Sequence, residues 1–203
     1  MTDDLSAELM QNELLPPLSA TELQQLLQLE HKPIFLVGMM GAGKTTLGRQ
    51  LARHLERDFL DLDHELEARC GVAVATIFDI EGEEGFRRRE TVELDRCSRM
   101  PSIVLATGGG AILAKENREM LAQRGTVVYL RTSSEELFNR LERDKTRPLL
   151  QTANPKQRII ELVQQREPLY EQIAEVIFET GSAPVYMAAK QLIDLLKEQK
   201  VIP

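Results

Sequence analysis

The sequence predicts an α/β protein in which helices cover both faces of a mostly parallel sheet. Short apolar runs typical of buried strands alternate along the chain with longer stretches of helical periodicity, as they do where parallel strands are joined by crossover helices. A glycine-rich loop lies between the first apolar run and the first such helix, where sheets of this kind bind phosphate groups. The length of 203 residues suits one domain with a short appendage.

The composition restricts the class of protein. Hydrophobic residues make up 42% of the chain and charged residues 28%, which is usual for a soluble globular protein. The formal net charge of -7 argues against a general nucleic-acid binder, because such proteins need a basic surface. No apolar run approaches the roughly 18 residues that cross a membrane, and the acidic start at Met1–Asp4 excludes a secretory or arginine-rich targeting peptide. We therefore expect a cytoplasmic protein that binds neither nucleic acid nor membrane, with Cys70 and Cys97 as reduced thiols.

Residues 1–31 stand apart from the rest of the chain. Pro16 and Pro17 interrupt any early helix, and Ser19 with Glu22 matches a capping box at the start of a new one. Leucines follow on one face of this short amphipathic helix, which we expect to dock on the protein's own domain. The predicted organisation is an N-terminal extension at 1–31, partly helical, and one phosphate-binding domain at 32–203.

The first strand is predicted at Ile34–Val37, directly before the segment Gly38–Thr45. This segment matches the pattern G-x-x-x-x-G-K-[ST] at every required position. Leu47, Leu51 and Leu55 follow with the spacing of a helix that is buried on one side. Strand, glycine loop and helix together are the context in which this pattern binds phosphate.

The loop predicts the binding of a nucleoside triphosphate. Glycines let backbone amides turn toward a polyphosphate, and the helix directs its free N–H groups and positive dipole end at the same charge. In this pattern Lys44 reaches the β- and γ-phosphates, and the Thr45 hydroxyl is a ligand of Mg²⁺. The residues expected to contact ATP here are Gly41, Ala42, Gly43, Lys44, Thr45 and Thr46.

Further strands and helices follow in alternation. The strands are predicted at Asp58–Asp63, Ser102–Ala106, Thr126–Leu130 and Val176–Glu179. The helices are predicted as a short turn at Thr76–Ile80 and longer segments at Glu83–Met100, Glu116–Gln123, Ser133 to about Arg143, a segment through Arg166, and Val185–Glu198. Asp144–Pro155 has no periodicity and is predicted to be a loop, and a loop of this length in a compact domain is usually functional or disordered.

Two carboxylates follow the second predicted strand, at the edge of the sheet where ligands gather. Asp61 and Asp63 are two residues apart on this strand, so we expect both side chains to leave on the same face. One carboxylate can face Mg²⁺ through water, and the other can accept the proton of an alcohol. Together with the phosphate loop, this is the arrangement that a kinase needs.

Arginines and a second glycine segment complete this edge. Of Arg87, Arg88 and Arg89, we expect one to point inward and grip a carboxylate with its guanidinium. Gly108–Gly110 costs backbone entropy unless something approaches it closely, with a structural tight turn as the alternative. Arg147, in the predicted loop, is suited to close over the phosphates and stabilise charge in the transition state.

These residues together resemble the shikimate kinase family from Lys32 to the last helix. The motifs that carry the resemblance are Gly38–Thr46, Asp61–Asp63, Gly85–Glu90, Ala106–Gly110, Arg147–Leu150 and Arg166–Tyr170. The resemblance implies a kinase, dependent on ATP and Mg²⁺, that phosphorylates the 3-hydroxyl of shikimate in the chorismate pathway to aromatic amino acids. It also implies a P-loop NTPase fold of three α/β/α layers, with a five-stranded parallel sheet and a mobile lid at about 142–155.

The resemblance assigns the acceptor side of the site to five residues. Asp63 would bind a shikimate hydroxyl as the base or orienter of its proton. Arg87 and Arg166 would clamp the shikimate carboxylate, and the backbone amides of Gly109 and Gly110 would contact the same substrate.

On the nucleotide side, the resemblance implies that Asp61 holds Mg²⁺ through water, beside Thr45. Arg140 and Pro184 would lie on either side of the adenine, and Arg147 would contact the phosphates of ATP. The catalytic residues would be Asp63, Lys44 and Arg147. The expected state is a monomer, with a dimer through residues 1–31 as the alternative.

Two other functions remain open from the sequence. Another kinase of the same fold, such as gluconate kinase, also handles a hydroxy acid with a carboxylate, although the glycine triplet and the setting of Arg87 favour shikimate. A non-catalytic relative that binds a nucleotide or a partner is the second alternative. Such relatives usually lose catalytic positions, whereas Lys44, Asp63 and Arg166 are present.

Overall fold

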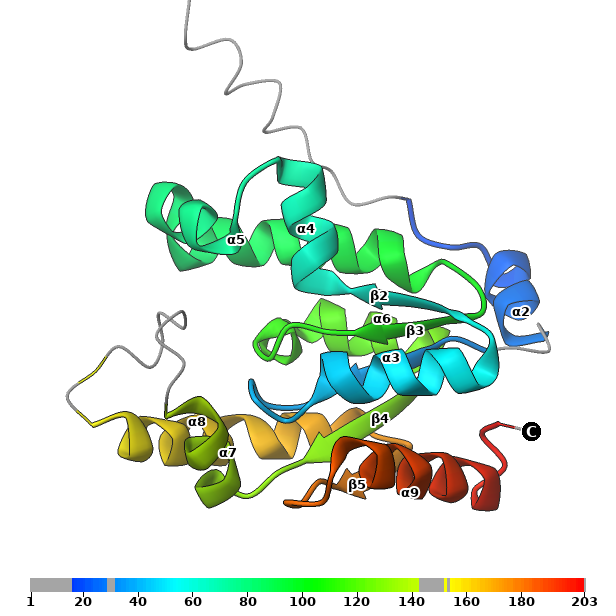
Figure 1. Cartoon of the computed structure of the whole chain (residues 1–203). Coiled ribbons are helices and arrows are strands. Elements are labelled where there is room, and N and C mark those ends of the chain that lie inside the picture. The colour runs from blue at the N-terminus through cyan, green and yellow to red at the C-terminus, as the bar shows by residue number, and fades with distance from the viewer. Residues whose placement is uncertain (1–15, 29–31, 143–151, 153, 203) are drawn as a thin grey trace, which may run out of the picture.

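The computed structural model describes residues 16–28, 32–142, 152 and 154–202. Its centre is a five-stranded sheet in the order β2-β3-β1-β4-β5 (Figure 1). The strands are β1 Ile34–Val37, β2 Asp58–Asp61, β3 Ile103–Ala106, β4 Thr126–Arg131 and β5 Val176–Glu179. Every strand pairing is parallel, which confirms the predicted parallel sheet.

Helices cover both faces of the sheet (Figure 1). They are α2 Ala20–Gln28, α3 Lys44–Leu55, α4 Leu62–Cys70, α5 Val74–Ser98, α6 Lys115–Arg124, α7 Ser134–Leu141, α8 Pro155–Ile173 and α9 Val185–Glu198, with a 3-10 turn η1 at Ala111–Leu113. Because side chains alternate along a strand, β1 contributes to two separate cores. Phe35 and Val37 pack with residues of α5, α6 and α8, while Ile34 and Leu36 pack with residues of α3 and α9. The predicted three-layer α/β/α architecture is confirmed.

The strand order determines where a ligand can bind. β1 lies between β3 and β4, so the chain after β1 first builds one side of the sheet and then crosses to the other. Ligands of open parallel sheets bind beyond the carboxyl ends of the strands, next to such a change of direction. The phosphate loop follows β1 at this point, and the glycine triplet follows the neighbouring β3.

The region after β2 differs from the sequence prediction. The strand was predicted to continue through Asp63, but β2 ends at Asp61 and α4 begins at Leu62. The Asp61 side chain caps this helix by accepting a hydrogen bond from the Asp63 backbone N–H, at 3.2 Å. Helix α4 was not predicted, because its buried side is only Leu62 and Leu66 and such a pair gives little periodicity to detect.

The long helical region α5 is interrupted at Gly82, between the two helical segments that the sequence predicts. Gly82 has φ 69° and ψ -176°, a backbone conformation that glycine adopts readily and other residues avoid. The predicted separation between Thr76–Ile80 and Glu83–Met100 is therefore confirmed. The first part is longer than predicted, because the helix already begins at Val74.

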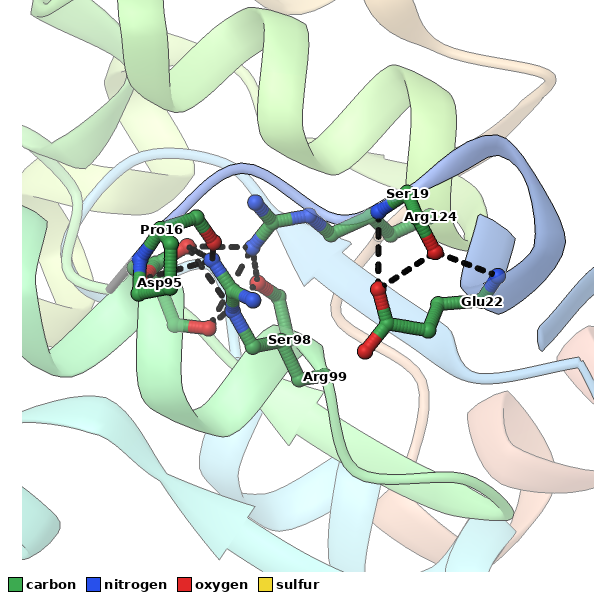
Figure 2. Close-up of polar contacts among 7 residues, drawn as sticks. All are labelled: Pro16, Ser19, Glu22, Asp95, Ser98, Arg99 and Arg124. Atoms are coloured by element: carbon green, nitrogen blue, oxygen red, sulfur yellow. Dashed lines mark hydrogen bonds and ion pairs between the residues drawn. The ribbon is translucent and has the colours of Figure 1, made fainter. Parts of the chain in front are cut away.

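The described part of the N-terminal extension lies on its own domain. Arg99 at the end of α5 donates a hydrogen bond to the Pro16 carbonyl, at 2.9 Å (Figure 2), and α2 lies against α6. Ser19 and Glu22 form the predicted capping box, with the Ser19 N–H donating to Glu22 Oε2 at 2.8 Å and the Glu22 N–H donating to Ser19 Oγ at 3.2 Å (Figure 2). The expected docking is thus observed for residues 16–28.

A buried ion-pair cluster supports this contact (Figure 2). The Asp95 side chain is only 3% exposed and pairs with Arg99 at 3.0 Å and with Arg124 at 2.8 Å. Arg124, at the end of α6, also donates to Ser98 Oγ at 2.7 Å. The cluster therefore ties the ends of α5 and α6 together where residues 16–28 dock.

Candidate active site

The phosphate loop is shaped by glycines in left-handed backbone conformations. Gly38, Gly41 and Gly43 have φ values of 143°, 79° and 96°, which side chains with a Cβ rarely adopt. The loop encloses the ammonium group of its own Lys44, which donates to the Gly38 carbonyl at 2.7 Å and to the Met39 carbonyl at 2.9 Å. The sequence motif therefore folds into the phosphate-binding conformation that it predicts.

A cleft of about 460 Å³ opens over this loop and the start of α3. We call it the large cleft. Its walls include Gly41, Ala42, Gly43, Lys44, Thr45, Thr46, Asp61, Asp63, Thr107, Gly109, Glu136, Arg140, Thr180, Gly181, Ala183 and Val185. All six loop residues predicted to contact ATP line it. A helix N-terminus at the base of a cleft suits a polyphosphate.

Thr45 and Asp61 bring a hydroxyl and a carboxylate together in the large cleft. Thr45 Oγ1 donates to Asp61 Oδ2 at 2.6 Å, while Asp61 Oδ1 accepts the α4 cap bond. Both side chains are therefore fixed, and hydroxyl and carboxylate oxygens are what Mg²⁺ prefers. The two residues fit the metal site that the sequence predicts.

Asp61 and Asp63 reach the same cleft for a different reason from the one predicted. The expected alternation along a strand does not apply, because Asp63 lies in the first turn of α4. The helix cap turns the chain so that both carboxylates nevertheless line the large cleft. The two carboxylates therefore lie at the predicted edge of the sheet, while the predicted local geometry, a strand that continues through Asp63, is wrong.

A second space, the small hollow, holds about 90 Å³. It is lined by Met40, Asp63, Val74, Phe78, Phe86, Arg87, Glu90, Gly108, Gly109, Gly110 and Arg166. Met40, Asp63 and Gly109 line both spaces. The Asp63 carboxylate can therefore contact a molecule bound in either space.

Of the arginine triplet, Arg87 is the residue that lines the small hollow. Arg88 pairs with Glu84 and its side chain is 68% exposed. Arg89 instead pairs with Glu81, on the other side of the break in α5. One inward arginine is what the helical spacing predicts.

Glu90 holds Arg87 in the small hollow. Its Oε2 accepts from Arg87 Nη1 at 2.6 Å, and the Glu90 side chain is only 1% exposed. Burial raises the pKa of Glu90 to about 7, against the lowering effect of Arg87, and the nearby Asp63 raises it further. Sequence reasoning gave Glu90 no role, although its i,i+3 spacing from Arg87 indicates such a pair.

The glycine triplet makes room for these charged groups. A Cβ on Gly108 would lie within 3.0 Å of Glu90 Oε1, and a Cβ on Gly110 within 3.0 Å of the Arg87 guanidinium. A Cβ on Gly109 would lie 3.1 Å from the backbone nitrogen of Met40. None of the three has the positive φ that would require glycine, so close approach explains the triplet better than a tight turn does.

Helix α8 completes the small hollow with a buried arginine. Arg166 is 2% exposed and donates from Nη1 to the Gly109 carbonyl at 3.2 Å. Desolvation lowers its pKa, with partial compensation from Tyr170, and the guanidinium still remains charged at neutral pH. Tyr170, one helical turn later, donates from its hydroxyl to the same carbonyl at 2.6 Å. Sequence reasoning included Tyr170 in a motif and gave it no role.

Arg140 links two segments that line the large cleft, the phosphate loop and the segment after β5. Its guanidinium donates to the Gly41 carbonyl at 3.1 Å and to the Gly181 carbonyl at 2.6 Å. Pro184 precedes α9 as its N-cap residue, and its neighbours Ala183 and Val185 line the cleft. Arg147 and most of the predicted lid at 142–155 lie outside the described residues.

The cysteines take no part in this site. Cys70 and Cys97 are both free thiols, and burial raises the pKa of Cys97 to about 12. Cys97 lies beside the carboxylates of Glu65 and Glu93, but Arg96 bridges these two carboxylates at 2.9 and 2.6 Å. This group is an ion-pair network rather than a metal site.

The fold and the two adjoining spaces define a P-loop kinase that phosphorylates a small molecule. Comparison with known proteins identifies the family. A sequence model of the family described as "Shikimate kinase" matches residues 40–197. The shikimate kinase of Bordetella pertussis (strain Tohama I) is 60% identical over 165 residues, which are 81% of this chain and 78% of the relative. That of Bordetella avium (strain 197N) is 56% identical over 176 residues, which are 86% of this chain and 84% of the relative.

Solved structures agree with the sequence relatives. A shikimate kinase from Acinetobacter baumannii in complex with shikimate has a TM-score of 0.82 at 48% identity, over 85% of this chain and 97% of that one. The shikimate kinase from Bacteroides thetaiotaomicron has a TM-score of 0.74 at 36% identity, over 82% and 98% of the two chains. The chain belongs to the shikimate kinase family.

No helix within the described part of the chain is long and apolar enough to cross a membrane.

Proposed function

We propose that the protein transfers the γ-phosphoryl group of ATP to the 3-hydroxyl of shikimate, with Mg²⁺ as cofactor. The observation that carries this proposal is the meeting of two spaces at Asp63, one floored by the phosphate loop and the other walled by two arginines. In-line transfer needs the acceptor hydroxyl next to the γ-phosphoryl group, and this junction supplies the place.

On the acceptor side, Arg87 and Arg166 bind the carboxylate of shikimate. Both arginines line the small hollow, and arginine suits a carboxylate because it can donate two parallel hydrogen bonds. The backbone amides of Gly109 and Gly110 contribute further donors to the substrate. Asp63 orients the 3-hydroxyl and accepts its proton as the oxygen attacks the phosphorus atom.

On the nucleotide side, the loop residues from Gly41 to Thr46 bind the phosphates of ATP. Lys44 exchanges its loop carbonyls for the β- and γ-phosphate oxygens, and Arg140 with Pro184 flanks the adenine. Mg²⁺, held by Thr45 directly and by Asp61 through water, supplies charge neutralisation on the β- and γ-phosphates.

Three further assignments are part of the proposal. Arg147, from a lid at about 142–155, contacts the ATP phosphates and is catalytic together with Asp63 and Lys44. Residues 1–31 form an extension of the kinase domain at 32–203. The protein acts as a monomer.

Gluconate remains the alternative acceptor to be tested. The described structure offers two arginines and a hollow of about 90 Å³, which suits a compact hydroxy acid.

A coupled assay of ADP release from ATP and Mg²⁺, with shikimate and gluconate offered separately, tests the proposal. We expect turnover with shikimate alone. Asp63→Asn should lower kcat by about a hundredfold or more, the range for loss of a general base, while binding of ATP survives. Near-normal kcat in this variant would reject the role of Asp63, and turnover of gluconate instead of shikimate would reject the substrate.

A further inference from the structure

The carbonyl of Gly109 is held by two donors from α8. The Tyr170 hydroxyl donates to it at 2.6 Å, and Arg166 Nη1 donates to it at 3.2 Å. The carbonyl belongs to the central residue of a glycine triplet, and glycine has more backbone freedom than any other residue. Turn bonds hold the peptides on either side, because the Ala111 N–H donates to the Gly108 carbonyl at 3.2 Å and the Leu113 N–H donates to the Gly110 carbonyl at 3.0 Å. The Gly109 carbonyl between them is bonded from α8 instead, so the contacts from α8 decide the orientation of the central Gly109–Gly110 peptide.

We propose that Tyr170 is a positioning residue for acceptor binding, through the orientation of the Gly109–Gly110 peptide. In a trans peptide the carbonyl and the N–H lie in one plane and point in opposite directions, and the described chain contains no cis peptide bonds. A Gly109 carbonyl held toward Tyr170 therefore directs the Gly110 N–H away from Tyr170. Gly110 lines the small hollow, and this inference rests on the proposed function of that hollow.

Tyr170 is better suited to this task than Arg166. Arg166 lines the small hollow, and under the proposed function its guanidinium has to serve the carboxylate of the substrate. The Tyr170 hydroxyl is neutral, and burial raises its pKa well above the ordinary range, so it remains a hydrogen-bond donor at any working pH. The hydrogen bond from the Tyr170 hydroxyl to the Gly109 carbonyl is also the shorter of the two, and Tyr170 has no other task in binding the substrate.

The tyrosine ring is itself fixed in place. Tyr170 is 0% exposed and stacks on Tyr129 with ring centroids 4.9 Å apart and an interplanar angle of 21°. Its hydroxyl also lies 3.8 Å from Met39 Sδ, in the phosphate loop. The hydroxyl thus lies between the phosphate loop and the glycine triplet. Because the ring cannot move freely, the hydroxyl holds the Gly109 carbonyl in one orientation.

The test compares Tyr170→Phe with Tyr129→Phe in the full-length protein. Both changes remove one hydroxyl from the same buried stack of rings. The Tyr129 hydroxyl interacts with Arg131, and Gly109 accepts from Tyr170, so only the first variant disturbs the triplet. The KM for shikimate at saturating ATP should rise roughly three- to tenfold in Tyr170→Phe, as expected for one hydrogen bond. The KM for ATP should change by less than about twofold in either variant.

A second readout avoids turnover altogether. The rise in Tm caused by shikimate alone should shrink in Tyr170→Phe and remain as in the wild type in Tyr129→Phe. It can be measured at any stability of the variant, because each protein is its own reference.

A shikimate KM and a shikimate-induced Tm shift that are the same in Tyr170→Phe and in the wild type would overturn the inference. So would equal changes in the two variants, which would indicate a general effect of the ring stack. If the wild type itself showed no turnover of shikimate, the proposed function would fail instead, and the two failures are therefore distinguishable.

Discussion

Glu90→Gln tests whether the buried carboxylate beside Arg87 makes the stability of the protein depend on pH. Burial raises the folded-state pKa of Glu90 to about 7, from an ordinary value of 4.5. The folded protein therefore binds this proton more tightly than the unfolded chain does. Between these two pKa values the folded state holds more protons, so the free energy of unfolding falls as pH rises through this window. Gln cannot ionise, and the variant lacks this contribution.

The magnitude follows from the size of the shift. A rise from 4.5 to about 7 corresponds to roughly 3 kcal/mol at about 1.4 kcal/mol per pKa unit. Of this total, about 2 kcal/mol is lost between pH 5.5 and pH 8 by the linkage relation. Over that range the free energy of unfolding of the wild type should fall by about 2 kcal/mol relative to Glu90→Gln.

Urea unfolding at a series of pH values, followed by circular dichroism, measures this difference. The side chain of Glu83 also pairs with Arg87, at 3.3 Å, and is 54% exposed. Glu83→Gln therefore controls for the loss of an ion pair to the same guanidinium, and its curve should stay parallel to that of the wild type. A difference between wild type and Glu90→Gln that stays constant from pH 5.5 to pH 8 would refute the reasoning.

Two further predictions concern space and the N-terminal extension. Gly110→Ala would place a Cβ within 3.0 Å of the Arg87 guanidinium, and we expect the KM for shikimate to rise about tenfold or more, as for loss of a charge-assisted hydrogen bond. Gly181→Ala, whose Cβ would meet nothing within 4 Å, is the matched control, and equal KM values in the two variants would contradict the explanation. Deletion of residues 1–31 should leave kcat and both KM values intact and lower Tm by about 2 to 6 °C, because it removes the contact of Arg99 with Pro16 and the packing of α2. A truncated protein that is folded but inactive would show that the extension takes part in the site.

The strands and the phosphate loop could be predicted because their signals are local. Ile34–Val37 is a continuous apolar run that ends in the loop motif, and the observed β1 has the same bounds. The same holds for Val176–Glu179 and for Val185–Glu198. A strand buried on both faces and an amphipathic helix each carry their pattern within a single short window.

The helix after β2 could not be predicted in the same way. Asp61 is both the last residue of β2 and the N-cap of α4. The sequence around an aspartate does not show which of these two positions it occupies. The prediction continued the alternation of Phe59, Leu60 and Leu62 because no glycine or proline marks the change. Asp61 and Asp63 nevertheless both line the large cleft, because a continuing strand and a helix that begins here would each place the two carboxylates at the same edge of the sheet.

The contacts within the small hollow lie beyond what spacing can show. Arg87 and Glu90 come from α5, and Arg166 and Tyr170 come from α8, while the glycine triplet follows β3. Spacing along a helix indicates each pair, but the fact that all of them surround one triplet depends on how α5 and α8 pack. The reason for three glycines therefore becomes visible only in the fold, as the space taken by Glu90 and Arg87.

The arrangement around Arg87 also indicates which bond a bound carboxylate would replace. Nη1 is held by the buried Glu90 at 2.6 Å, whereas Nη2 is held by the exposed Glu83 at 3.3 Å. Removing Glu90 from its partner would leave a buried carboxylate uncompensated, which is costly. Glu83 can return to water at little cost. A substrate carboxylate that reaches Arg87 should therefore displace Glu83 and leave the pair with Glu90 intact, so that Glu90 keeps the guanidinium in place throughout binding.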